Sequence, residues 1–289
     1  PGIVKKLAEG EKAARESYWL ATIVTDAPLD FCPEDNLLKA PGPAAYPLFL
    51  KLEFTRLIEK FGLSPDAAPA QEKQPRISVT VEQVTEPDQA ERLLSMWKAA
   101  DHVSLLVLPD CSAVGVFCET GNGTAVMAEL FFEQYLGDWN SLLEVLFSEK
   151  VKKVSHNVKD VIRTLLTGGL PAGGFIFDTA LAAYLLDATA GSYDLQRLFV
   201  SWFNEELPKP LYLEKDAFSL LADTAASAAS LDSYVTAVDA LYGVLAPKLR
   251  ERDMWKLFET AELPLCRILA EMELAGCGAD ARALAAFSE

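Results

Sequence analysis

The stretch from Ser155 to Phe199 limits the possible folds of this chain more than any other part of its sequence. It contains a helical pattern over Val158–Leu166, which ends in a turn rich in glycine and proline. Short apolar runs at Val151–Val154 and Phe175–Phe177 flank this helix and have the length of buried strands. The alternation of strand and helix predicts an α/β unit.

A second helix should follow this unit directly, over Ala180–Leu186. Asp178 or Thr179 can cap it, because a short side-chain oxygen accepts hydrogen bonds from the free N–H groups of a first helical turn.

The segment before the central stretch alternates in the same way. Strands are predicted at Ile77–Val81, Val103–Leu108, Ala113–Cys118 and Thr124–Leu130, and helices at Asp88–Ala100 and Leu142–Phe147. Short turn signals separate the last three strands, so they should pair antiparallel in succession. The whole therefore predicts a mixed α/β sheet flanked by helices.

Helical appendages are predicted on both sides of this sheet. Leu48–Phe61 has helical spacing, and Ser64–Arg76 is a linker rich in Ala, Pro and Gln. Toward the C-terminus, Leu231–Leu249 and Met254–Glu273 are expected to be long helices. Pro264 should kink or restart the second of them.

Composition narrows the functions that are possible. The chain has 289 residues, 51% of them hydrophobic, and a formal net charge of −16. Tight DNA binding needs clustered Lys and Arg side chains that displace counterions from the phosphates. Because this chain is strongly acidic, we do not expect it to bind DNA strongly by itself. No membrane-length apolar run or secretory signal occurs, which predicts a cytoplasmic protein without a membrane partner. The five cysteines lack Cys-x-x-Cys spacing, which predicts neither a disulfide framework nor a zinc site.

Three stretches carry a resemblance to a known family. The central stretch contains HN-x-K, FDT-x-L-x-x-Y-L-L and A-G-S-Y-D-L, Ala21–Phe31 reads ATIVTDAPLDF, and Glu262–Asp280 reads ELPLCRILAEMELAGCGAD. The first resembles the middle of the 3′–5′ exonuclease domain of bacterial DNA polymerase I, a family A polymerase. The second resembles the end of that enzyme's 5′ nuclease region, and the third resembles the first helix of its polymerase region.

The resemblance implies a ribonuclease H-like 3′–5′ exonuclease fold with helical appendages at both ends. It divides the chain into a helical tail at 1–63, a linker at 64–75 and an exonuclease-like domain at 76–253. Residues 254–289 would begin the polymerase region with its first thumb-side helix.

Exonucleases of this family resemble two-metal phosphodiesterases, in which clustered carboxylates hold two divalent cations about 4 Å apart. The first family motif is Asp-x-Glu at the end of the first hairpin strand. Here Val107 and Leu108 occupy that place, and the nearby Asp110 follows a proline before a turn. Its simplest role is to accept hydrogen bonds from the local backbone.

The second motif is Asn-x-x-x-Asp. Asn157 matches it, but Val161 stands where the Asp belongs, and Asp160 is one residue early, a rotation of about 100° on a helix. The third motif is Tyr-x-x-x-Asp, and Tyr234 stands in its Asp position. A neutral hydroxyl replaces a carboxylate poorly at neutral pH.

Other titratable residues of the sequence lack catalytic spacing. His102 and His156 have no Ser, Cys or acid at a recognisable distance along the sequence, so a structural or surface role is expected. Asp232 and Asp239 are expected on the solvated face of their helix.

The sequence thus predicts a fragment of a bacterial DNA polymerase I whose exonuclease-like domain is catalytically inactive and structural. The fragment would need no cofactor, whereas the parent would use magnesium for nucleotidyl transfer in DNA replication and repair. We expect a monomer that meets DNA through the parent, weakly by itself, and that contacts the flanking polymerase and 5′ nuclease regions. Two alternatives stay open: a weak metal-dependent 3′–5′ exonuclease using Asp110 and Asp160, and a module that stacks single-stranded DNA on Trp202 or Tyr212.

Overall fold

The computed structural model describes residues 2–26, 28, 37, 41–42, 44–52, 54–63, 78–121, 123–214, 217–218, 224–278, 280, 282 and 286–287. The chain forms two compact units, Pro1–Pro41 and Gly42–Glu289. The helices of the second unit are α2 (Ala45–Lys51), α3 (Thr55–Phe61), α4 (Pro87–Ala99), α5 (Trp139–Leu146), α6 (Val158–Thr167), α7 (Thr179–Leu186), α8 (Leu195–Phe203), α9 (Thr224–Glu251), α10 (Trp255–Leu257) and α11 (Leu263–Ala275). Short 3₁₀ turns lie at Phe132–Gln134 and Leu211–Leu213, and a π-helical turn lies at Phe258–Glu262.

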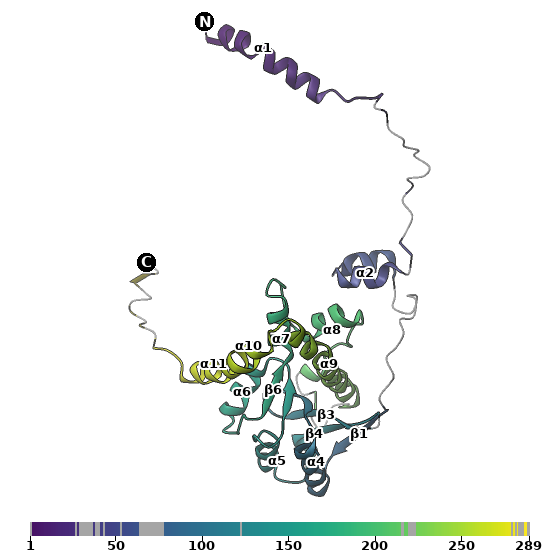
Figure 1. Ribbon diagram of the computed structural model, residues 1–289, viewed down its shortest axis with the longest axis vertical. Helices are drawn as coiled ribbons and strands as arrows, with labels where there is room; N and C mark the ends of the chain where they lie inside the picture. Colours follow the sequence, from purple (N-terminus) through teal and green to yellow (C-terminus); the bar gives the residue numbers. More distant parts are fainter. Residues whose placement is uncertain are drawn as a thin grey trace. The chain divides into compact units, whose positions relative to one another are not determined.

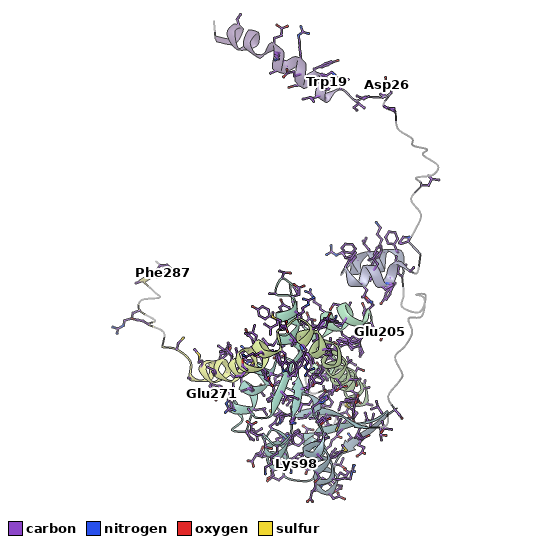
Figure 2. All side chains as sticks on the ribbon, viewed as in Figure 1. Trp19, Asp26, Lys98, Glu205, Glu271 and Phe287 are labelled. Carbon is purple, nitrogen blue, oxygen red and sulfur yellow. The ribbon has the colours of Figure 1, made fainter. Side chains whose placement is uncertain are left out.

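The first unit contains one long helix, α1 (Gly2–Ala21). Its surface carries the ion pair between Arg15 Nη2 and Glu11 Oε1, 2.9 Å apart. Apolar side chains are exposed at its C-terminal end, among them Trp19, which is marked in Figure 2. Val4, near the start of the helix, is exposed as well, so exposed apolar side chains occur toward both ends of α1.

Six strands build the sheet of the second unit: β1 (Ser78–Val84), β2 (Val103–Val107), β3 (Ala113–Gly121), β4 (Thr124–Phe131), β5 (Lys153–Ser155) and β6 (Phe175–Asp178). Their order is β1-β4-β3-β2-β5-β6 (Figure 1). β2, β3 and β4 pair antiparallel in succession, as the sequence predicts, whereas β1, β5 and β6 each join the sheet in parallel. The predicted mixed sheet with flanking helices is confirmed.

The sheet separates two hydrophobic cores, because successive side chains of a strand point to opposite faces. On one face, which we call the α9 face, the core contains residues of α7, α8 and α9. On the other, the α6 face, the core contains residues of α4, α5 and α6. β2 shows the alternation: Val103 and Leu105 belong to the α6 face, whereas Leu106 packs against the α9 face.

Helix α9 lies close against the middle of the sheet. A Cβ atom placed on Gly115 of β3 would be 2.9 Å from Cγ2 of Val235 and 3.1 Å from Cγ of Leu231. A larger residue at this position would push α9 away from β3, so glycine permits the close approach.

The helix predicted over Leu48–Phe61 is wrong as a single element. The chain turns at Leu52, and α2 and α3 form two short helices. The turn brings the rings of Phe54 and Phe61 close to that of Phe49, with centroid distances of 6.2 and 6.4 Å. Aromatic packing between the two helices therefore outweighs the continuous helical spacing of the sequence.

The C-terminal helix restarts near Pro264, as predicted. The π-helical turn ends at Glu262, and Pro264 occupies the first turn of α11, where its missing N–H costs nothing.

The domain limits after residues 63, 75 and 253 stay predictions, and the linker at 64–75 lies outside the described residues. Among the residues described, no helix has the length and apolarity to cross a membrane.

Candidate functional site

The end of β2, where the family's first acidic motif would lie, carries no carboxylate on the strand itself. Val107 packs into the core of the α6 face, and Leu108 packs against the core of the α9 face. The two residues are neighbours in the sequence and therefore point to opposite sides of the sheet. Apolar side chains therefore pack on both sides of the sheet at this strand end.

Asp110 lies in the turn between β2 and β3 and binds that turn. Its Oδ1 accepts hydrogen bonds from the N–H of Ser112 at 3.0 Å and from the Ser112 hydroxyl at 2.7 Å. The next residue, Cys111, has a φ of 57°, which completes the turn. This is the local role that the sequence predicts for Asp110.

The second motif lies at the start of α6. Asn157 precedes the helix in a left-handed conformation, with a φ of 55° that asparagine tolerates better than most residues. Val161 is buried in the core of the α6 face. Asp160 is exposed, and its Oδ1 lies 3.3 Å from Nη2 of Arg163 and 3.9 Å from Nζ of Lys159. Its carboxylate is therefore engaged with cations of its own helix.

Tyr234, in the position of the third motif, is buried in α9. Its hydroxyl donates a hydrogen bond to the carbonyl oxygen of Pro208 at 3.0 Å, and its ring meets that of Tyr212 at 5.1 Å. Burial raises the pKa of Tyr234, and the charge of Asp194 adds to the rise. The side chain therefore stays neutral at physiological pH, and its hydrogen bond holds the segment at Pro208 against α9.

The four residues at the motif positions are divided between the two cores of the sheet. Val107 and Val161 belong to the α6 face, whereas Leu108 and Tyr234 belong to the α9 face. Two cavities of about 590 and 400 Å³ flank the turn at Pro109 and Asp110, one on the side of α6 and one on the side of Tyr212. Within the described ranges, no group of three or more His, Cys, Asp or Glu side chains could hold a metal ion.

Asp178, which matches the family pattern, has a structural role in which its side chain accepts hydrogen bonds at the starts of two helices. This buried carboxylate accepts hydrogen bonds from the N–H groups of Asn157, Val158, Ala180 and Leu181, at 3.1, 2.8, 2.9 and 3.3 Å. The predicted cap of α7 is confirmed. The same side chain also caps α6, so it ties the starts of two helices to the end of β6.

A polar cluster under α9 escaped the sequence analysis. The Ser104 hydroxyl donates to Asp239 Oδ1 at 2.7 Å, and Nε2 of His102 lies 3.6 Å from the same oxygen. The expectation that Asp239 faces solvent is wrong, because the close packing of α9 on the sheet partly buries it. Asp239 lies between the other two groups, so His102 has no contact through which to activate the buried Ser104.

The other histidine, His156, follows β5 and is structural, in agreement with the sequence. Its Nδ1 lies 2.8 Å from the Thr179 hydroxyl oxygen. Burial lowers the pKa of His156 to about 4, against a smaller opposing effect of Asp194. The imidazole is therefore neutral at physiological pH and pairs with the start of α7.

Asp232 also departs from its expected place on a solvated face. It pairs with Glu129, which lies on β4 directly across from Gly115 and thus beneath α9. Burial raises the pKa of Asp232 to about 7, and the charge of Glu129 and a hydrogen bond to it add to the rise. Burial also raises the pKa of Glu129. The two carboxyl groups therefore share a proton, because two negative charges at close range in a buried position would repel each other.

Replacing Asp232 by asparagine should stabilise the protein at alkaline pH. The folded pKa lies above the unfolded value of 3.8, so the stabilising effect of the shared proton is complete below about pH 4 and is lost as the pH rises through 7. An amide donates to Glu129 at any pH, so we expect a gain on the order of 1–2 kcal/mol at pH 8 and little change at pH 4.

Thermal unfolding of both proteins at pH 4 and pH 8 measures this difference. An equal effect of Asp232→Asn at the two pH values would contradict the shared proton. Asp101→Asn serves as the control for a general change of charge, because Asp101 is exposed and lies outside this pair.

Comparison with solved structures defines the class of fold. NrnC from Brucella melitensis superposes with a TM-score of 0.51 at 16% identity, over 69% of this chain and 94% of that one. A structure titled the POL domain of Pol1 from M. smegmatis, in complex with DNA primer-template and dNTP, superposes with a TM-score of 0.57 at 23% identity, over 70% of this chain and 33% of that one. The fold is that of the ribonuclease H-like 3′–5′ exonucleases.

The comparison of sequences is more specific than the comparison of folds. DNA polymerase I of Caldicellulosiruptor bescii is 26% identical over 99% of this chain, which spans 30% of that relative's length. No family model matches the chain. The chain is similar to a segment of DNA polymerase I from several bacteria, and it spans about a third of the length of the curated relatives that match nearly all of it.

Proposed function

We propose that this chain is part of a DNA polymerase I in which the exonuclease-like domain has lost its chemistry and acts as a structural brace. The parent enzyme would copy DNA by magnesium-dependent nucleotidyl transfer during replication and repair, as a cytoplasmic monomer. The domain would hold the flanking 5′ nuclease and polymerase regions at fixed positions along the same polypeptide. The segment itself needs no metal or cofactor in this role.

One observation carries this proposal. The positions where the family draws metal-binding carboxylates hold Val107, Leu108, Val161 and Tyr234 instead, and each of these side chains packs in a core or binds the backbone. Two close divalent cations need several anionic oxygen ligands. Meanwhile the scaffold persists, because Asp178 still caps both helices that frame the former site.

DNA contact is proposed to occur mainly through the parent enzyme. The related M. smegmatis structure is a complex with DNA primer-template, whereas this chain has a formal charge of −16. Affinity of the chain alone for single strands should therefore stay in the non-specific range, roughly 10⁻⁴ to 10⁻⁶ M. The stacking alternative has one exposed candidate, Trp202, since Tyr212 is buried.

The chain is expected not to shorten single-stranded DNA. Incubation of the purified protein with a 5′-labelled oligonucleotide and magnesium or manganese should leave the substrate intact, because the carboxylates are missing. Manganese should also leave the melting temperature unchanged, since an ion that binds only the folded state would raise it.

The double variant Asp110→Asn/Asp160→Asn is the matched control for this assay. Metal-dependent shortening by the native chain that disappears in the double variant would establish the weak exonuclease instead. Submicromolar binding of single strands at physiological salt, lost in Trp202→Ala, would establish the stacking module.

A further inference from the structure

The outer edge of strand β1 carries no further strand within the part of the chain that the structure describes. β1 stands at one end of the strand order and pairs with β4 on its inner side (Figure 1). The first four residues of β1, at 78–81, are exposed. The N–H and C=O groups along such an edge can pair with another extended chain, which then continues the sheet. The edge of β1 is therefore a surface to which a peptide can add as a strand.

An apolar groove of about 330 Å³ lies beside this edge on the α9 face. Val79 and Val81 of β1 line it and are 42% and 54% exposed. Met127 of β4, Phe199 of α8 and Ala237 of α9 supply further apolar lining. Every second side chain of a strand added to β1 would point to this face, because successive side chains of a strand face opposite sides of a sheet. The groove therefore offers side-chain contacts in addition to backbone pairing.

Two carboxyl groups at the groove have no Lys or Arg partner among the described residues. Asp232 of α9 lines the groove, and its Oδ1 is buried without a hydrogen-bond partner. Glu129 of β4 lies two residues after Met127, is 9% exposed and pairs with Asp232 through a side-chain hydrogen bond. The nearest acid of β1, Glu82, pairs instead with Arg92 of α4 on the α6 face. Buried carboxyl groups without a cation favour a ligand that brings one.

We propose that the edge of β1 and this groove bind an extended peptide of a partner protein, in which a Lys or Arg stands between apolar residues. The peptide would add a strand beside β1 and place its cation at Asp232 and Glu129, with its apolar side chains over Val79 and Val81. The ammonium or guanidinium group would then take the place of the shared proton between the two carboxyl groups. This surface lies outside the motif positions, so the inference is independent of the proposed loss of exonuclease chemistry.

Charge favours this partner over two others. Single-stranded nucleic acid would bring phosphates beside two carboxyl groups, which would repel them. A second copy of this chain paired through its own β1 would present Val79, Val81 and Gln83 to the groove, and none of these carries a positive charge. A basic and apolar peptide supplies both the cation and the apolar side chains that the groove lacks.

Calorimetric titration with two synthetic peptides tests this site. The first, acetyl-Val-Thr-Val-Thr-Lys-Thr-Val-amide, presents its Val and Lys side chains on one face when it is extended, and the second carries norleucine in place of Lys. We expect this chain to bind the Lys peptide about tenfold or more tightly than the norleucine peptide at pH 8. Equal affinity for the two peptides would overturn the role of the carboxyl pair.

The preference for Lys should depend on pH. Asp232 and Glu129 face the groove from α9 and β4, and the residues that line it from β1 and α8 are not titratable. Burial raises the pKa of Asp232 to about 7 and also raises that of Glu129, so at pH 5 the pair holds more protons and less negative charge. Affinity for the Lys peptide should therefore fall about tenfold from pH 8 to pH 5, while that for the norleucine peptide stays nearly constant. A preference for Lys that is the same at both pH values would contradict the inference.

Matched variants locate the contact. Val81→Lys places a cation in the groove, whereas Thr80→Lys places the same charge on the opposite face of the same exposed strand. The first should weaken binding of the Lys peptide about tenfold, and the second should change it by about twofold or less. Asp232→Asn combined with Glu129→Gln should abolish the preference for Lys over norleucine, and thermal unfolding checks that this variant is folded.

The remaining outcomes would each overturn the inference. Equal weakening by Val81→Lys and Thr80→Lys would show that the peptide responds only to the total charge of the chain. Sedimentation showing a dimer of this chain that the Lys peptide does not dissociate would show that a second copy covers the edge. Binding by this chain but not by the full-length polymerase would show that a segment of the same polypeptide, and not a partner protein, occupies the groove.

Discussion

Replacing Phe177 by alanine should destabilise the protein by about 3–5 kcal/mol, the range for loss of a fully buried aromatic ring. Phe177 has no exposed surface, and its ring centroid lies 4.9 Å from those of both Tyr242 and Phe258 and 6.3 Å from that of Trp255. These partners belong to α9, the π-helical turn and α10. One residue of β6 therefore joins the sheet to the long helix and to the C-terminal helices.

Urea unfolding of the isolated chain measures this loss. Phe132→Ala is the matched control, because that ring is 55% exposed and meets the ring of Trp139 edge-on. The control should lose about 1 kcal/mol or less. If the two variants were equally stable, Phe177 would not be the packing centre that the geometry indicates.

The same substitution separates a structural from a chemical role. If the domain braces the polymerase, Phe177→Ala should lower the melting temperature and the polymerase output of the full-length enzyme. Asp110→Asn and Asp160→Asn should leave both nearly unchanged, because these carboxylates are exposed and bind only their own turn or helix. The reverse pattern would favour retained exonuclease chemistry.

Asp178→Ala is expected to cost about 3–4 kcal/mol, because the carboxylate caps two helices and its removal leaves buried donors unpaired. Its side chain is 3% exposed, so water cannot readily replace the four lost hydrogen bonds. The destabilisation should therefore exceed that of an ordinary cap substitution.

Asp194→Ala provides that ordinary comparison. Asp194 is exposed and caps only α8, where its Oδ1 accepts a hydrogen bond from the N–H of Arg197 at 3.0 Å. Its Oδ2 accepts from the Ser192 hydroxyl at 2.6 Å and lies 3.5 Å from Nε of Arg197, both at the surface. Its loss should cost about 1 kcal/mol. Circular dichroism during urea unfolding of the two variants measures both values, and equal losses would show that Asp178 supports a single helix.

Much of the fold could be predicted because its signals are local. The apolar runs of β2, β5 and β6, the helical spacing of α6 and the cap at Asp178 each lie within a short window of sequence. The role of Asp110 in its turn and the apolar residues at the motif positions could also be read from short stretches of sequence. The prediction of one helix over Leu48–Phe61 was wrong, because aromatic packing between α2 and α3 favours two short helices over the continuous helical spacing.

The sequence by itself determined the order of most strands and helices and the similarity to DNA polymerase I, because these depend on residue identity and short-range spacing. Only the tertiary structure decided the partners of Asp239 and Asp232 and the second helix capped by Asp178. Ser104 and Asp239 are 135 residues apart in the chain, yet their side chains meet. Burial and hydrogen bonding depend on which distant segments pack together, and no local window of sequence contains that information.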